Sequence, residues 1–140
     1  MSLRRYRVVG VDDSEDDLLL LERALRGASR LDLTATLRDG IQAIAYLNGE
    51  DRFADRSRWP VPDLLVLDLK MPNLDGFGVL EWLAQRPPHG CKVVVLTSSL
   101  AEVDKRRALK LGADAVYIKP PDPAGYRALA RMLEAKMIGP

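Results

Sequence analysis

The stretch PDLLVLDLKMP, from Pro62 to Pro72, organises the interpretation of the whole chain. Five of the six residues from Leu64 to Leu69 are Leu or Val, with no polar residue at helical spacing. Such an apolar run between prolines predicts a strand buried on both sides, as in a parallel sheet. Asp68 stands at the carboxyl end of this run, where it either caps a turn or faces the crevice at which open α/β sheets bind ligands.

Length and composition bound the class of protein. The chain has 140 residues, enough for one domain with one core, and a net charge of +1. A charge this close to zero gives no support for binding nucleic acid or an anionic membrane. No apolar run approaches the roughly 20 residues of a membrane span, and no signal peptide is recognisable. Cys91 is the only cysteine, which fits a reducing cytoplasm.

Apolar runs typical of strands alternate along the chain with segments of helical periodicity. The expected strands are Tyr6 to Val11, Leu31 to Leu37, Leu64 to Leu69, Lys92 to Leu96 and Ala113 to Ile118. The expected helices begin at Ser14, Ile41, Phe77, Leu100 and near Pro123, and the last one runs to about Met137. This alternation predicts an α/β fold in one domain over residues 1–140, a doubly wound (βα)5 arrangement whose five-stranded parallel sheet has helices on both faces.

The segment from Asn48 to Pro62 fits neither a strand nor a helix. It contains Gly49, two prolines and many Asp and Arg residues, with Trp59 as an aromatic anchor. We interpret it as a long surface loop. Two roles stay open: a solvated insertion pinned by Trp59, which is the simpler interpretation, or a contact site for a specific partner.

Chemically capable side chains stand where four of the five strands end. They are Asp12 and Asp13, Asp68, Thr97 and Lys119. Right-handed crossovers place these strand ends on one edge of the sheet. Three carboxylates on one edge repel each other unless a cation intervenes, and their oxygens suit Mg²⁺.

A phosphoryl group on Asp68 would fit the charges of this edge. A carboxylate can act as a nucleophile and form an aspartyl phosphate. The three phosphoryl oxygens could then be bound and neutralised by Mg²⁺, the Lys119 ammonium and the Thr97 hydroxyl.

These motifs resemble those of the response-regulator receiver domains of bacterial two-component signalling. The matching segments are Asp12-Asp13, Leu67 to Gly76 around Asp68, Thr97-Ser98 and Lys119-Pro120. The resemblance covers the whole chain and implies a CheY-like, flavodoxin-like fold in which Asp68 accepts phosphate from a sensor histidine kinase. It implies a magnesium site made of Asp12, Asp13, Asp68 and the backbone carbonyl of Lys70, with Thr97 and Lys119 on the phosphoryl group. Such a domain catalyses only its own phosphorylation and dephosphorylation.

The resemblance also implies a two-state switch, and this chain departs from the family pattern for it. The family usually has Tyr or Phe three residues before the lysine, where this chain has Val116, with Tyr117 one residue later. A one-residue step on a strand moves a side chain to the opposite face. We therefore predict that Tyr117 is a packing residue and that Thr97 carries the switch alone. In the family the bond before Pro120 is often cis.

The long loop and the expected absence of an output domain resemble a single-domain subgroup that partners bacterial phytochromes and related sensor kinases. Many of its members form homodimers through the side of the fourth and fifth helices. A homodimer is therefore an expectation here, with Val116, Tyr117 and Met132 or Met137 as contact residues that could equally be core residues. The sequence names neither the cognate kinase nor the downstream target.

Individual residues argue against two alternative functions. A haloacid-dehalogenase type of phosphatase needs an Asp two residues after its nucleophile, where this chain has Lys70. The acidic run from Asp12 to Asp17 would repel the phosphate of a flavin in a flavodoxin-like carrier. A phosphorylation-independent adaptor with the receiver fold, and a phosphate sink or relay, stay open as alternatives.

Overall fold

The computed structural model describes residues 4–86 and 89–139. Its strands are β1 (Tyr6–Val11), β2 (Leu31–Leu37), β3 (Leu64–Leu67), β4 (Lys92–Thr97) and β5 (Ala115–Ile118). Its α-helices are α1 (Glu15–Arg26), α2 (Gly40–Leu47), α3 (Gly76–Ala84), α4 (Glu102–Lys110) and α5 (Pro123–Ile138), and a short 3-10 helix η1 covers Asp51–Phe53. The predicted alternation is confirmed. Strand β3 ends at Leu67 and not at Leu69, while β5 and α4 begin at Ala115 and Glu102 and not at Ala113 and Leu100.

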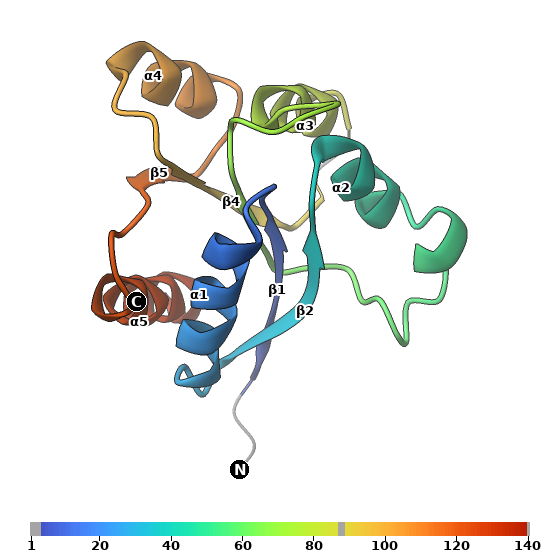
Figure 1. The fold of residues 1–140 in the computed structure, drawn as a ribbon. Coiled ribbons are helices and arrows are strands. Elements are labelled where there is room, and N and C mark those ends of the chain that lie inside the picture. The colour runs from blue at the N-terminus through green and yellow to red at the C-terminus, as the bar shows by residue number, and fades with distance from the viewer. Residues whose placement is uncertain (1–3, 87–88, 140) are drawn as a thin grey trace.

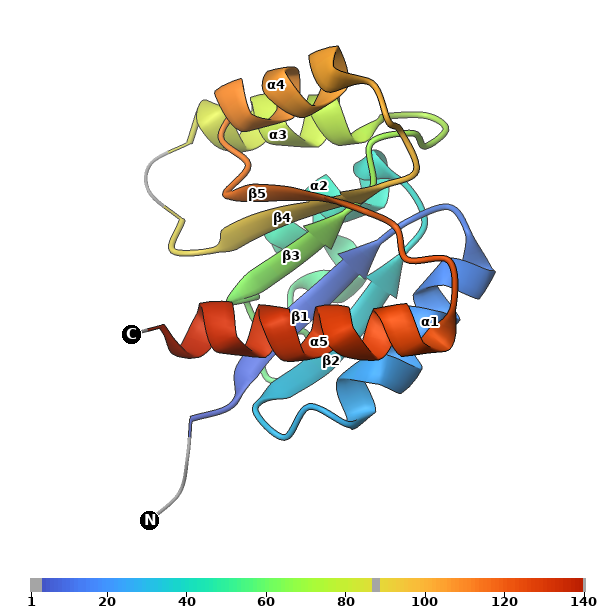
Figure 2. The same cartoon turned by 90° about the vertical axis from the view of Figure 1, so that its left-hand side faces the viewer.

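The five strands form one parallel sheet in the order β2-β1-β3-β4-β5. Helices α1 and α5 cover one face, and α2, α3 and α4 cover the other (Figures 1 and 2). The central strand β3 is buried along its whole length, as the apolar run predicted. The doubly wound α/β fold is therefore confirmed.

Each face of the sheet carries its own hydrophobic core. Leu65 and Leu67 of β3 belong to the core under α2, α3 and α4, whereas Leu64 and Val66 belong to the core under α1 and α5. Successive side chains of a strand point to opposite faces, so one strand supplies both cores.

The last strand follows the same rule of alternation. Val116 packs against the core on the α3 and α4 side, and Tyr117 packs against the core on the α1 and α5 side. The prediction that Tyr117 is a packing residue on the opposite face from Val116 is confirmed.

The segment from Asn48 to Pro62 is held against α2 by an aromatic cluster. The ring of Phe53 lies 5.0 Å from that of Tyr46 and 5.4 Å from that of Trp59, measured between centroids. The Tyr46 hydroxyl donates to the Pro60 carbonyl at 2.7 Å. Phe53 is buried while Trp59 is only half-buried, so the deeper anchor is Phe53 and not the Trp59 named from the sequence.

Side-chain caps explain where four of the helices begin. Ser14, Asp39, Asp75 and Asp122 each accept the backbone N–H three residues later, at α1, α2, α3 and α5. Such caps satisfy N–H groups that have no partner inside a helix. Among the helices in the described ranges, none combines the length and apolarity that crossing a membrane requires.

Candidate functional site

The polar residues at the strand ends meet at the carboxyl edge of the sheet, as the topology predicted. The backbone ladder continues one residue beyond the strands there. The N–H of Asp68 donates to the carbonyl of Val11 at 2.9 Å, and the N–H of Lys119 donates to the carbonyl of Thr97 at 2.8 Å. These bonds fix the backbone from which the side chains of Asp68 and Lys119 extend into the crevice between β1, β3 and β5.

Three carboxylates converge in this crevice. Asp12 and Asp68 are 6% and 5% exposed, and Asp13 is exposed. One oxygen of each lies within 4.8 Å of the others. Backbone N–H groups orient the two buried ones: Ser14 donates to Asp12 Oδ1 at 3.0 Å and Leu69 donates to Asp68 Oδ1 at 2.8 Å.

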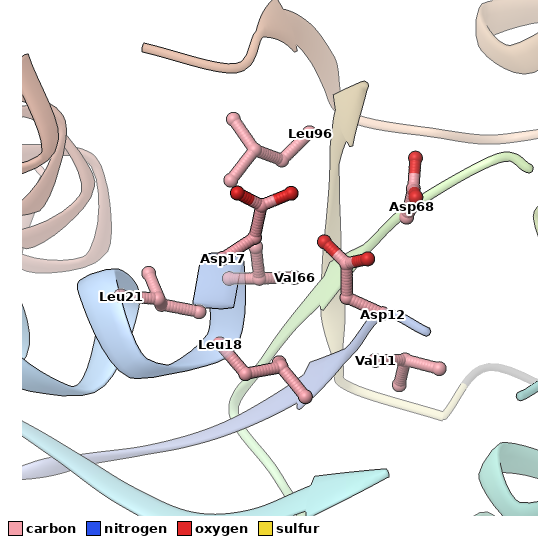
Figure 3. A pocket seen from close by; sticks show the side chains of 8 residues that line it. All are labelled: Val11, Asp12, Asp17, Leu18, Leu21, Val66, Asp68 and Leu96. Atoms are coloured by element: carbon pink, nitrogen blue, oxygen red, sulfur yellow. The ribbon is translucent and has the colours of Figure 1, made fainter. Parts of the chain in front are cut away.

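The Lys119 ammonium lies among these carboxylates, and the side chain as a whole is only 10% exposed. Its Nζ is 2.8 Å from Asp12 Oδ2 and 3.2 Å from Asp68 Oδ2. A further carboxylate, that of Asp17 in the first turn of α1, is also 2.8 Å away. Figure 3 shows the side chains of Asp12, Asp17 and Asp68 around this space.

Burial and neighbouring charges shift the pKa values of Asp12 and Lys119 in opposite directions. Burial raises the pKa of Asp12 to about 6, although the hydrogen bonds from Lys119 and the Ser14 N–H lower it in part. Burial alone would lower the pKa of Lys119, but its hydrogen bonds to Asp12 and Asp17 and the negative charge of Asp68 raise that pKa above its ordinary value. Lys119 is therefore a permanent cation in a crevice with an excess of negative charge.

Thr97 is buried at the end of β4, and within the described residues no hydrogen bond joins its side chain to the acidic cluster. Its Oγ1 accepts the N–H of Ser99 at 3.1 Å, and among the described residues it makes no other side-chain hydrogen bond. The Ser99 hydroxyl donates to Asp104 Oδ2 on α4 at 2.7 Å. Asp104 also lies 3.7 Å from Lys70 Nζ, so this loop is linked both to α4 and to the loop after β3.

The carboxylate oxygens of the crevice are suitable ligands for a divalent cation. Carboxylate oxygens are hard ligands that suit Mg²⁺ better than soft metals. Asp13 forms no ion pair within the described part of the chain, and one ammonium does not balance four nearby carboxylates. The residues therefore fit a hard divalent ion on the Asp12, Asp13 and Asp68 side of the crevice.

The structure also adds a residue and corrects one expectation. No role in the site was expected for Asp17 from the sequence, whereas in the structure its carboxylate accepts a hydrogen bond from the Lys119 ammonium. Its spacing was a usable signal, because Asp17 lies four residues before the buried Leu21 and therefore on the same face of the helix. The bond before Pro120 is trans, the lower-energy form for a bond before proline.

Comparison with known proteins agrees with the family resemblance of the sequence motifs. Residues 8–131 match the family described as response regulator receiver domain. A protein-glutamate methylesterase/protein-glutamine glutaminase of Anaeromyxobacter dehalogenans is 39% identical over 110 residues, which cover 79% of this chain and 28% of that protein. The chain spans at most half the length of the curated relatives it matches first.

Two solved structures illustrate the similarity in three dimensions. The phosphorylated cyanobacterial phytochrome response regulator RcpA has a TM-score of 0.83 and 29% identity, over 96% of this chain and 95% of that one. The Mn²⁺-bound response regulator Rcp1 has a TM-score of 0.77 and 28% identity, over 92% of this chain and 91% of that one. Both similarities extend over more than nine-tenths of each chain.

Proposed function

This chain belongs to the response regulator receiver domain family, and from that premise we propose that it accepts a phosphoryl group on Asp68 from a sensor histidine kinase. One observation carries the proposal: the buried Asp68 carboxylate lies 3.2 Å from the Lys119 ammonium and beside two further carboxylates. A buried cluster of like charges costs stability, and such clusters are concentrated at functional sites. In this proposal the chain acts in signal transduction in the cytoplasm, and it catalyses only its own phosphorylation and dephosphorylation.

We assign a magnesium site to the same crevice. The ligands are the carboxylates of Asp12, Asp13 and Asp68, with the backbone carbonyl of Lys70. Bound Mg²⁺ supplies positive charge that neutralises the phosphoryl oxygens during transfer. The hard oxygen donors and the similarity to a Mn²⁺-bound response regulator support this assignment.

The chemical step is a displacement at phosphorus. An Asp68 carboxylate oxygen forms a bond to phosphorus while the bond between phosphorus and the kinase histidine nitrogen breaks, and the electron pair leaves with that nitrogen. The Lys119 ammonium exchanges its Asp68 contact for a phosphoryl oxygen and keeps the added charge paired. Thr97 Oγ1 accepts one hydrogen bond, so its own hydrogen is available for another phosphoryl oxygen.

Movement of Thr97 toward the phosphoryl group provides the switch. The Ser99 N–H is bound to Thr97, and the Ser99 hydroxyl is bound to Asp104 of α4, so a shift of Thr97 is passed to the β4–α4 loop and to α4. This segment carries exposed apolar side chains, with Leu100 83% and Val103 72% exposed. We propose that phosphorylation changes this surface for a protein partner.

A second copy of the chain is one candidate for that partner. Of the residues considered for a homodimer contact, Met132 is exposed on α5, while Met137 packs against the core. Val116 and Tyr117 also pack against the two cores, which leaves Met132 as the side chain available for contact. The similarity to the phytochrome response regulator RcpA supports a phytochrome or related sensor kinase as the phosphodonor.

The second candidate function is a phosphorylation-independent adaptor, favoured by Val116 in place of the family's aromatic residue. Phosphate incorporation separates the two. We expect acetyl phosphate with Mg²⁺ to add one phosphoryl group to wild type and none to Asp68→Asn, measured by intact mass.

Asp63→Asn is the matched control, because Asp63 is an aspartate beside the same strand at the opposite end. It should keep full incorporation. Size-exclusion elution of the same samples reports whether phosphorylation changes assembly. A wild-type protein that takes no phosphate from acetyl phosphate or from other small phosphodonors would favour the adaptor instead.

A further inference from the structure

Asp17 is the residue of the crevice that the proposed magnesium and phosphate chemistry leaves without a role. Its Oδ2 lies 2.8 Å from Lys119 Nζ, as close as the Asp12 oxygen and closer than that of Asp68. We propose that Asp17 is a positioning residue for Lys119, holding the ammonium so that Asp12 and Asp68 stay available to Mg²⁺. This inference deepens the proposed function, because it rests on magnesium binding in the same crevice.

The position of Asp17 is well defined by its surroundings. Its backbone N–H donates to the Ser14 hydroxyl at 3.2 Å, which fixes the first turn of α1. Its side chain is 29% exposed, compared with 10% for that of Lys119. Beside it lies a cavity of about 10 Å³, about the volume for one water molecule, lined by Asp12, Asp17, Asp68 and five apolar residues (Figure 3).

The argument depends on the number of donors that Lys119 has. A lysine ammonium has three N–H donors, and here oxygens of three different carboxylates lie 2.8, 2.8 and 3.2 Å from its nitrogen. If Asp17 loses its charge, the donor it holds turns to the remaining oxygens of Asp12 and Asp68. Those are ligands of the proposed magnesium site, so Lys119 would then compete more strongly with the metal ion. The loss of one nearby negative charge acts in the same direction.

A role in the helix alone does not account for this geometry. The first turn of α1 has two other acidic residues that suit the helix dipole, Glu15 and Asp16. Glu15 pairs with Arg38 at 2.9 Å, outside the Lys119 cluster, and Asp16 is exposed. Asp16→Asn therefore removes the same charge from the same turn without touching Lys119, and it is the matched control for Asp17→Asn.

The first test is magnesium affinity, measured by titration calorimetry on the metal-free protein. We expect Asp17→Asn to raise the Kd for Mg²⁺ about five- to tenfold, because one ligand-competing contact and one charge change together. Asp16→Asn should change it less than about twofold, since exposed charges are screened. Asp17→Glu, which restores a carboxylate, should recover most of the affinity.

The second test asks whether Asp17 acts through Lys119. In a Lys119→Met background, Asp17→Asn should raise the Kd by a clearly smaller factor than in the wild-type background, because the shared partner is gone and only the loss of one charge remains. The hydrogen exchange of the Lys119 ammonium, followed by nitrogen-15 NMR in the metal-free protein, should be faster in Asp17→Asn than in wild type or Asp16→Asn. This readout needs no bound metal ion and remains valid if the Lys119→Met protein does not fold.

Two results would overturn the inference: an unchanged Mg²⁺ Kd in Asp17→Asn, or the same change with and without Lys119. Phosphate incorporation on the same proteins separates this outcome from the fate of the proposed function. Wild type that binds Mg²⁺ but takes no phosphate would contradict phosphorylation and leave the role of Asp17 to be decided by affinity and exchange. Wild type that binds no Mg²⁺ would overturn both the magnesium site and the positioning role.

Discussion

Aspartates stand at both ends of the parallel sheet, and the two ends treat them differently. At the amino end, Asp63 precedes β3 and Asp114 precedes β5. Asp63 Oδ2 accepts the N–H of Arg7 at 2.8 Å, and Asp114 Oδ2 accepts the N–H of Val93 at 2.7 Å. Each of these carboxylates is thus paired with the backbone of the neighbouring strand.

At the carboxyl end the same residue type has no such backbone partner across the sheet. The N–H groups of Asp12 and Asp68 continue the ladder to the carbonyls of the neighbouring strands. The groups that strand ends present there include C=O, which repels a carboxylate instead of binding it. Asp12 and Asp68 therefore converge on the buried Lys119 ammonium. Asp63 and Asp114 are instead held by backbone N–H groups, and the ion pair added there, from Arg4 to Asp63, is largely exposed. The polarity of the strands therefore decides at which end of the sheet the proposed site for Mg²⁺ and a phosphoryl group lies.

The largest expected difference between the ends concerns the response to phosphorylation. We expect Thr97→Ala to take up phosphate but to lose the phosphorylation-linked NMR shifts of α4, because no hydroxyl is left to bind the phosphoryl group. Thr97→Ser should keep them. Thr34→Ala, which removes a hydroxyl on the edge strand β2 that donates to the Val8 carbonyl, should also keep them. Unaltered α4 shifts in phosphorylated Thr97→Ala would show that the switch does not depend on Thr97.

The next expected difference is that neutralising an aspartate has opposite effects on stability at the two ends of the sheet. Without Mg²⁺ at pH 7.5, Asp12→Asn should increase the free energy of unfolding by about 2 to 3 kcal/mol, because burial raises the pKa of Asp12 to about 6 and its ionised form is costly. Asp63→Asn should decrease that free energy by about 1 kcal/mol, since it weakens a charge-assisted hydrogen bond. Urea unfolding of both variants measures the two effects.

The pH dependence of the Asp12 effect follows from the direction of its pKa shift. A carboxyl whose pKa is raised on folding stabilises the protein fully below its unfolded pKa, and this contribution is lost as the pH rises through the folded pKa. The advantage of Asp12→Asn should therefore grow between about pH 4 and pH 6 and vanish at pH 4. An equal advantage at pH 4 and pH 7.5 would mean that packing and not charge causes it.

Magnesium binding should show the reverse pH dependence. The proposed site uses the ionised form of Asp12. Since the pKa of Asp12 is about 6, lowering the pH from 7.5 to 5 should raise the Kd for Mg²⁺ about tenfold. The rise in unfolding midpoint with added Mg²⁺ reports this affinity. Asp12→Asn should bind more weakly and with little change over this pH range, whereas a strong residual pH dependence would point to another titrating group.

The sequence was sufficient for the fold because its central strands are nearly pure apolar runs. Leu64–Leu67 and Val93 to Leu96 have no polar residue among them, which only a strand covered on both faces allows. The same runs locate Asp68 and Thr97, because a polar residue directly after such a run lies at the edge of the sheet. Lys119 and Asp12 were located by the same logic.

The misses share a physical cause, since each depends on contacts between segments far apart in the chain. Asp17 satisfies the local rules for a helix start, and its spacing from Leu21 indicates only the face on which it lies, not the partner 102 residues away. Phe53 stands among charged residues and is buried only because it fits between Tyr46 and Trp59. Local patterns therefore predicted the elements, while long-range pairing selected which side chains complete the crevice and anchor the insertion.

The smallest expected effect belongs to an ion pair at the amino end. Arg5 and Asp32 form a two-pronged contact, but their side chains are 53% and 45% exposed. Water solvates such a pair almost as well when it is broken, so Arg5→Ala should leave the unfolding midpoint unchanged within error at low and physiological salt.

Lys119→Met provides the contrast, because it removes the only cation bound among Asp12, Asp17 and Asp68 in the described residues. Without Mg²⁺ it should lower the midpoint clearly, and added Mg²⁺ should restore part of the loss by supplying the missing positive charge. Equal effects of the two substitutions would mean that burial does not separate the ends of the sheet. A loss that Mg²⁺ does not relieve would mean that the aliphatic part of Lys119, and not its charge, holds the crevice together.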